Sequence, residues 1–235
     1  MASDAAADDR FGWSVAIDGD TVVVAAPLDD DDGGKSGAVY VFRTRDDGAT
    51  YGQVAKLTAS DAASNDEFGG SVAIDGATIV AGARYDDDDG SNSGSVYVFR
   101  TSDGATYGQV AKLTASDAAS NDEFGISVAI DGATIVAGAR YDDSSGSNSG
   151  SVYVFRTRDD GATYGQVAKL TASDAASNDQ LGGSVAIDGA TVVVGAYFDD
   201  DGGSNSGSVY VFRTNGATYG QVAKLTASDA ASNDE

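Results

Sequence analysis

Hydrophobic and polar positions follow a pattern that returns about every 56 residues. Within one period, four short runs rich in Val, Ile, Ala and aromatic residues occupy positions 69–74, 78–84, 95–100 and 107–114. Asp75-Gly76 separates the first two runs, and such a dipeptide is typical of a tight hairpin. None of the runs shows the three-to-four-residue spacing of an amphipathic helix. The pattern therefore predicts four short antiparallel strands per period.

The four runs differ in how much apolar surface they carry. The third run, SVYVFR, is apolar on both faces of the pleat, so we expect it to lie buried between neighbouring sheets. The first run contains Gly69, Gly70 and Ser71, small residues that suit a crowded innermost strand. The fourth run carries Gln109 and Lys112 and suits an outer edge. The expected order of strands is thus from the inside to the outside of a blade.

The period occurs four times in one domain that spans residues 1–235. The predicted units are residues 11–67, 68–123, 124–180 and 181–235, and the 19-residue segment GATYGQVAKLTASDAASND recurs in all four without a change. Residues 2–10 read as a decayed copy of the end of a unit. These features predict an all-β fold, a β-propeller of four four-stranded antiparallel blades. A β-solenoid is the alternative, but solenoid repeats are usually shorter and contain fewer hairpins.

The units resemble the FG-GAP repeat of integrin α-chain propellers and of many microbial and algal surface proteins. The resemblance rests on the Phe-Gly pairs at 11–12, 68–69 and 124–125, the Ser-Val-Ala-Ile that follows them, variants of Val-Gly-Ala, and Val-Tyr-Val-Phe at 39–42, 96–99, 152–155 and 209–212. It implies a non-catalytic binding or adhesion module of a surface or secreted protein. It also implies an extracellular or cell-surface location, although the first ten residues lack the apolar core of a secretory signal.

Two features depart from that family. Integrin-like blades that hold calcium have an Asp-rich loop between the first two strands, whereas this chain has only one carboxylate there, for example Asp75. Family propellers also usually have seven blades, and this chain supplies four. Three arrangements remain open: an arc that is part of a larger ring, a ring made from two chains, or a closed ring of four blades. An open arc exposes two apolar blade faces, which favours self-association.

The net charge of the chain limits which classes of partner it can bind. The chain has 14 basic and 37 acidic residues, a net charge of −23, and no Cys or His. Nucleic acid and anionic membrane surfaces are therefore poor partners. No apolar run approaches the roughly 20 residues that membrane insertion requires. Cations, or a protein or glycan ligand bound through an acidic face, fit the composition better.

The acidic residues are expected to gather on one face. In an up-and-down blade, the loops after the second strand lie on the same side as the links between blades, and these segments hold 27 of the 37 acidic residues. Three of the loops contain an Asp-x-Asp-Gly string, in which Gly lets the chain curl around an ion. The candidate metal ligands are Asp30, Asp32, Asp87, Asp89, Asp199 and Asp201, and calcium is the candidate cofactor. The alternative is a solvated or salt-adapted surface.

Three functions compete at this point. The first is the binding or adhesion module, and the second is a structural spacer built of amplified blades. The third is a propeller-based polysaccharide hydrolase or lyase. We expect no enzyme, because catalysis needs unlike groups gathered in one place and near-identical units supply near-identical loops.

Overall fold

Sixteen β-strands make up the regular structure of the part described by the computed structural model, residue 4 and residues 6–229. The first blade contains β1 (Val15–Asp18), β2 (Thr21–Ala26), β3 (Ala38–Arg43) and β4 (Gly52–Leu57). The second contains β5 (Ser71–Asp75), β6 (Thr78–Ala83), β7 (Ser95–Thr101) and β8 (Tyr107–Leu113). The third contains β9 (Val128–Asp131), β10 (Thr134–Ala139), β11 (Ser151–Arg156) and β12 (Gly165–Leu170). The fourth contains β13 (Ser184–Asp188), β14 (Thr191–Ala196), β15 (Ser208–Thr214) and β16 (Tyr219–Leu225).

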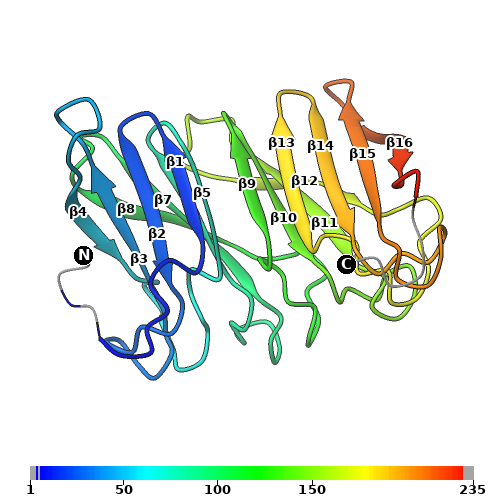
Figure 1. Cartoon of the computed structure of the whole chain (residues 1–235), viewed down its shortest axis with the longest axis horizontal. Coiled ribbons are helices and arrows are strands. Elements are labelled where there is room, and N and C mark those ends of the chain that lie inside the picture. Colours follow the sequence, from blue (N-terminus) through cyan, green and yellow to red (C-terminus); the bar gives the residue numbers. More distant parts are fainter. Residues whose placement is uncertain (1–3, 5, 230–235) are drawn as a thin grey trace.

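Each sheet is an antiparallel meander whose strands follow chain order. The four sheets stand side by side along an arc (Figure 1), and the first strands form its inner row, with β5 in contact with β1 and β9. This arrangement confirms the predicted propeller blades, since a solenoid would run its sheets across the repeats instead of within them. Among the described residues there is no helix long and apolar enough to cross a membrane.

The predicted strands are confirmed, with small shifts at their ends. The first strand of the second blade begins at Ser71, two residues later than expected. The reason is that Gly69 and Gly70 form a bend, in which both amides donate to the carbonyl of Gly82. The third strand is buried on both faces from Ser95 to Phe99, as the sequence predicted.

At each junction between blades, one aromatic or aliphatic side chain from the later unit is buried among residues of the earlier unit. Phe124, the first residue of the third unit, is fully buried in a cluster with Val96 and Leu113 of the second unit. Its ring centroid lies 5.5 Å from that of Tyr153, edge to face. Phe68 and Leu181 occupy the corresponding positions at the other two junctions. The residue that opens each of the last three units is therefore a plug that fills the unit before it.

Polar groups repeat at the same junctions. The carbonyl of Gly125 accepts a hydrogen bond of 2.8 Å from the Ser71 hydroxyl of the preceding unit. The Asp75 carboxylate accepts one of 2.5 Å from the amide of Gly132 in the next hairpin. Gly94 has a φ of +84°, and the carbonyl of Phe124 lies where a Cβ of residue 94 would be. Only glycine fits at that position, because both the backbone angle and the space exclude a side chain.

Among the described residues, no further blade covers the two ends of the arc. The first and fourth blades lie at opposite ends of the molecule (Figure 1). Val15 on β1 is 63% exposed, whereas the equivalent Val72 is 8% exposed. Leu225 on β16 is 53% exposed, whereas the equivalent Leu113 is 4% exposed. The chain therefore forms an open arc, and a closed ring of four blades is excluded.

Replacement of a buried plug should cost far more stability than replacement of the exposed one. Phe124→Ala leaves a cavity between two blades and should lower the free energy of unfolding by about 3–5 kcal/mol. Phe11→Ala, the same substitution at the 42%-exposed first plug, should cost less than half as much. Urea denaturation followed by tryptophan fluorescence and circular dichroism compares the two. Equal losses would contradict the packing described here.

Candidate functional site: the acidic face and its lysine clusters

The loops after the second strand of each blade run beside the links between blades. In the second unit, the amide of Asn121 in the link donates to the carbonyl of Ser91 in the loop at 2.8 Å. The amide of Glu123 donates to the carbonyl of Asn92 at 3.1 Å. The first and third units repeat these bonds. The acidic loops and links therefore share one face, as the sequence predicted.

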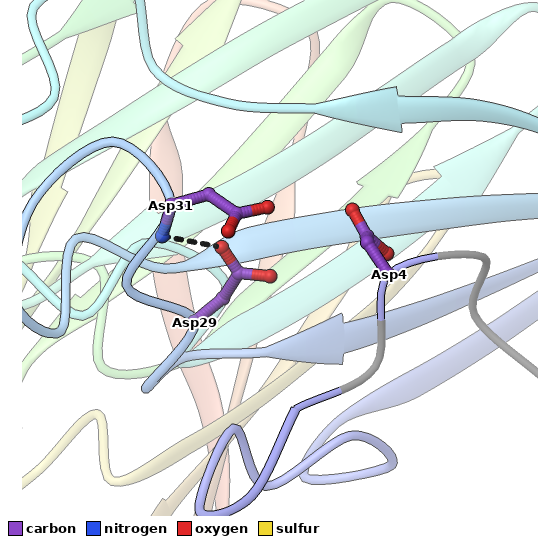
Figure 2. Close-up of side chains that lie close together, drawn as sticks. All are labelled: Asp4, Asp29 and Asp31. Carbon is purple, nitrogen blue, oxygen red and sulfur yellow. Dashed lines mark hydrogen bonds between the residues drawn. The ribbon is translucent and has the colours of Figure 1, made fainter.

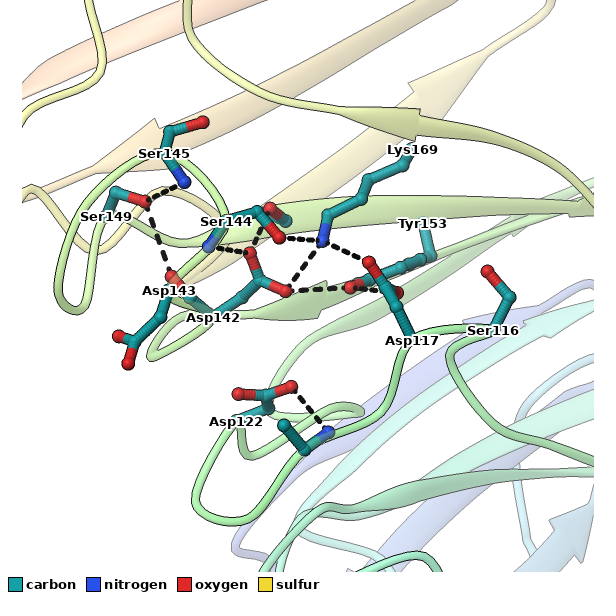
Figure 3. A network of polar contacts seen from close by, with 12 residues as sticks. Ser116, Asp117, Asp122, Asp142, Asp143, Ser144, Ser145, Ser149, Tyr153 and Lys169 are labelled. Atoms are coloured by element: carbon teal, nitrogen blue, oxygen red, sulfur yellow. Dashed lines mark hydrogen bonds and ion pairs between the residues drawn. The ribbon is translucent and has the colours of Figure 1, made fainter.

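A buried carboxylate stands at the base of each loop. In the third unit (Figure 3), Asp142 accepts hydrogen bonds of 2.8 Å from both Tyr153 and Ser151, which lie on β11. The Lys169 ammonium, reaching up from β12, lies 2.7 Å from Asp142 and 2.7 Å from Asp117 of the incoming link. It also donates to the Ser144 hydroxyl. One lysine thus joins an outer strand, a loop and the link from the preceding unit.

The same lysine cluster recurs in every unit. In the first unit, Lys56 lies 3.0 Å from Asp29, 2.6 Å from Asp31 and 2.8 Å from Asp4. Figure 2 shows these three carboxylates converging, with Asp4 coming from the N-terminal segment. The segment before Phe11 therefore acts as a link, which fits its sequence likeness to the end of a unit. The remaining clusters are Lys112 with Asp61, Asp86 and Asp88, and Lys224 with Asp174, Asp199 and Asp201.

The charges within a cluster stabilise one another. Burial by itself raises the pKa of Asp142, but the hydrogen bonds from Lys169, Ser151 and other donors outweigh burial, so its pKa lies below the ordinary value. Burial likewise lowers the pKa of Lys169, but the hydrogen bonds to Asp117 and Asp142 outweigh it and raise that pKa. Each cluster is consequently an ion-paired tie within the fold.

The carboxylates of two clusters lie close enough together to be considered as ligands of one metal ion. Asp4, Asp29 and Asp31 bring their oxygens close enough for one, and so do Asp61, Asp86 and Asp88. In both groups, however, a lysine ammonium already lies 2.5–3.0 Å from each of the three carboxylates. A divalent cation there would have to displace a bound positive charge. The clusters therefore do not fit a metal centre.

The predicted metal ligands fall into two groups. Asp199 is buried against Lys224 and Tyr210, and Asp201 pairs with the same lysine. The other four are exposed on the loops, and their carboxylates make no ion pair or hydrogen bond with any described residue: Asp30, Asp32, Asp87 and Asp89. In the first two units, the aspartates that the structure brings together thus lie one residue before the predicted ones. They are Asp29 with Asp31, and Asp86 with Asp88. Metal binding at the predicted residues stays a prediction.

A second buried carboxylate lies in each link. Asp66 accepts a hydrogen bond of 2.9 Å from the amide of Ala63, and Asp122 accepts one of 2.9 Å from Ala119. Burial raises the pKa of both carboxyls to about 6, in spite of those hydrogen bonds, and nearby loop aspartates such as Asp86 add to the effect. Burial also raises the pKa of Asp179 in the last link. The link carboxyls should therefore gain protons at a higher pH than ordinary carboxyls do.

The face remains strongly acidic after every internal ion pair is counted. The outer-strand lysines, which the sequence placed on a separate edge, point into this face, so eight basic groups lie on it. Of the 27 acidic residues assigned to it, Asp234 and Glu235 lie outside the described residues. The 25 others against eight basic groups give a net charge of −17. The concentration of negative charge on this face, predicted from the sequence, is therefore confirmed, but the net charge of the face is smaller than predicted.

The strands, plugs and loops match a known family of repeats. The model of the FG-GAP repeat matches residues 1–42, 51–99, 107–155 and 164–212. The chain belongs to the FG-GAP repeat family. Each of the last three matches runs from the outer strand of one blade to the third strand of the next, so every such FG-GAP unit spans a junction between blades.

The fold also occurs among solved structures. A crystal structure from Bacteroides uniformis, described provisionally as a 6-phosphogluconolactonase, matches with a TM-score of 0.62 and 15% sequence identity. The match covers 93% of this chain and 57% of the other chain. At that identity it shows a shared fold alone. No curated protein matches the sequence.

Removal of a cluster lysine should leave a buried carboxylate without its positively charged partner. Lys169→Met leaves Asp142 without its ammonium partner and should lower stability by about 3–5 kcal/mol at pH 7. Because the folded pKa of Asp142 is depressed, the stabilisation exists above the ordinary carboxyl pKa and is lost as the pH falls through the folded value. The difference between wild type and variant should therefore shrink below about pH 4.

Urea denaturation at several pH values measures this difference. Lys35→Met is the matched control, since Lys35 is exposed and makes no ion pair with any described residue. The cluster has no such role if both variants lose the same stability at pH 7.

The link carboxyls should act in the opposite sense. Their folded pKa lies above the unfolded value, so ionisation destabilises the fold, and the thermal midpoint should rise as the pH falls from 7 to 5. Asp66→Asn keeps an acceptor for Ala63 but removes the charge, and should add about 1 kcal/mol of stability at pH 7. Its thermal midpoint should change less between pH 7 and pH 5 than that of the wild type. A variant that is less stable at pH 7 would contradict the assignment.

Proposed function

We propose that this FG-GAP propeller segment is a non-catalytic binding module that holds a cationic partner on its acidic face. The partner is a protein or glycan that presents amino or guanidinium groups, and the setting is the cell surface or the extracellular space. The observation that supports this most directly is the exposed row of aspartates on the loop crests. The internal ion pairs involve other carboxylates and leave Asp30, Asp32, Asp87 and Asp89 available.

The repetition of the units favours a partner that makes several weak contacts. The first two loops present exposed carboxylates at equivalent positions, Asp30 and Asp32 in one blade and Asp87 and Asp89 in the next. A partner with spaced positive charges can therefore contact several equivalent carboxylates at once. A field of this strength also speeds the encounter with cations, and the effect falls steeply with ionic strength. We include calcium as a weak ligand of the same carboxylates, because hard cations prefer oxygen ligands.

In one cavity away from the acidic face, two ionisable groups have structural partners, which supports a non-catalytic role. A cavity of about 560 Å³ between the second and third blades is lined by Asp75, Arg100, Asp160 and Tyr164, among others. Asp75 accepts a hydrogen bond from Gly132, and Arg100 lies 4.0 Å from Asp160. This pairing favours a structural part for these groups over acid–base chemistry.

The test uses a cationic probe and two variants of equal charge. A labelled decalysine peptide should bind the wild-type chain at about 0.01 M salt and be released at about 1 M, where the screening length falls from about 30 Å to 3 Å. Asn at Asp30, Asp32, Asp87 and Asp89 should weaken binding about tenfold. Asn at Asp20, Asp47, Asp160 and Asp188, on the opposite face, removes the same charge and should have a much smaller effect.

Fluorescence anisotropy measures both affinities. Equal weakening by the two variants would show that only the net charge matters and would refute a binding face. Thermal melts in millimolar calcium examine the metal part separately, since a rise should occur in the wild type and be absent in the loop variant.

A further inference from the structure

The open face of the fourth blade contains a cavity of about 330 Å³. Its lining includes Ser184 on β13, Val209 on β15 and Leu225 at the end of β16, together with Gly207 just before β15 and Ala227 just after β16. Leu225 is 53% exposed there. We call this cavity the terminal socket.

The three other blades have the same socket, and each of those is filled. In the second unit, Val96, Leu113 and Ala115 are the residues equivalent to Val209, Leu225 and Ala227, and they enclose Phe124 of the third unit. In the third unit the equivalent residues enclose Leu181. In all three filled sockets, the same kind of side chain occupies the cavity. It is the Phe or Leu that opens a following unit.

Polar groups of the terminal socket also match the filled ones. Ser71 and Ser127 donate to the carbonyls of Gly125 and Gly182, the residues after the plugs, at 2.8 Å. Ser184 is the equivalent hydroxyl of the fourth blade, and it makes no hydrogen bond with any described residue.

The hairpins repeat this pattern of matched polar groups. Asp131 accepts a hydrogen bond from the Gly189 amide of the next hairpin. Asp188, its equivalent in the fourth unit, has no next hairpin within the described residues.

The opposite end of the same chain carries the complementary group. Phe11 packs edge to face against Tyr40, with ring centroids 5.5 Å apart, as Phe124 packs against Tyr153. Phe124 is fully buried by the preceding unit, whereas Phe11 is 42% exposed. Val15 and Ile17 beside it are more exposed still. This end is an uncovered plug with an apolar surround.

The segment before Phe11 already has the backbone shape of a link. Asp8 and Arg10 have φ values of +71° and +57°, close to the +72° and +52° of Asn121 and Glu123 in a true link. In true links, the corresponding amides donate to the preceding loop. The amides of Asp8, Arg10 and Phe11 have no backbone acceptor among the described residues. The N-terminal end is therefore shaped for a preceding unit.

We propose that the terminal socket of one copy of this chain receives the Phe11–Gly12 edge of a second copy. The contact reproduces the internal junction, with Phe11 between Val209 and Leu225, and the Ser184 hydroxyl donating to the Gly12 carbonyl. It is heterologous, because two different surfaces meet, so copies associate head to tail. Because every copy is strongly acidic, association strengthens as salt rises. Binding of a cationic partner to the acidic face weakens with salt, so the two proposals fail or succeed separately.

Two single variants and their mixture test the contact. Phe11→Asp spoils the plug, and Leu225→Asp spoils the socket at an exposed position. Sedimentation velocity at 0.5 M salt and rising protein concentration should show the wild type above its monomer mass of 23.6 kDa. Each variant alone should stay monomeric. An equimolar mixture should form one-to-one dimers and nothing larger, because each variant brings one intact surface.

Two controls and circular dichroism keep the test independent of folding. Val222→Asp alters a valine whose equivalents, Val110 and Val167, stay exposed even in the two central blades. The Val222→Asp variant should therefore associate like the wild type. Phe11→Leu introduces the residue that plugs the third socket, and it should also associate. A monomeric wild type, an inert mixture, or dimers that only one variant disrupts would each overturn the head-to-tail contact.

The end of the chain offers one more check. Residues 226–235 read TASDAASNDE, like a link, whereas in the proposed contact the incoming copy supplies its own link through residues 4–10. A chain that lacks residues 230–235 should therefore associate at least as tightly as the full chain. Loss of association in that shortened chain would also overturn the proposal.

Discussion

The structure depends on the burial of one side chain at each junction between blades. A single four-stranded sheet of this sequence has apolar residues on both faces, so it cannot bury its surface alone. Phe68, Phe124 and Leu181 solve this by filling the unit before them, and glycines at the contact let the backbones approach. Stability then becomes a sum of units and junctions, and cohesion is weakest at the two ends, where one partner is missing.

The acidic face follows from the same arrangement. Packing blades side by side brings all loops and links to one side, which concentrates negative charge there. The fold limits the resulting repulsion with one lysine per unit, and that lysine holds the incoming link by its aspartate. The buried carboxylate at the base of each loop is paired in this way, while Asp30, Asp32, Asp87 and Asp89 at the loop tips face solvent. The face therefore has ion-paired carboxylates at its base and exposed carboxylates at its surface.

The strands and their order were predictable because they rest on local signals. Alternation, the Asp-Gly hairpin and the doubly apolar third strand all act within a few residues. The lysine clusters were not predicted, because Lys169 meets Asp142 and Asp117 across 27 and 52 positions of sequence. Their spacing depends on loop conformation. The fourth unit nevertheless shows which positions pair. Its three consecutive aspartates end at Asp201, so an Asp-x-Asp pair can only begin at Asp199. In the first two units, four consecutive aspartates allow such a pair to begin at either of two positions.

Amide hydrogen exchange, resolved by unit, tests most directly whether identical junctions hold the fold together. Global opening of a junction exposes the strands on both of its sides, so protection should be highest in β7 and β11, each flanked by two filled junctions. Protection should fall toward β3 and β15, which have identical or nearly identical sequences but only one filled junction each. Measured in dilute solution, where copies are separate, equal protection of all four third strands would contradict the account.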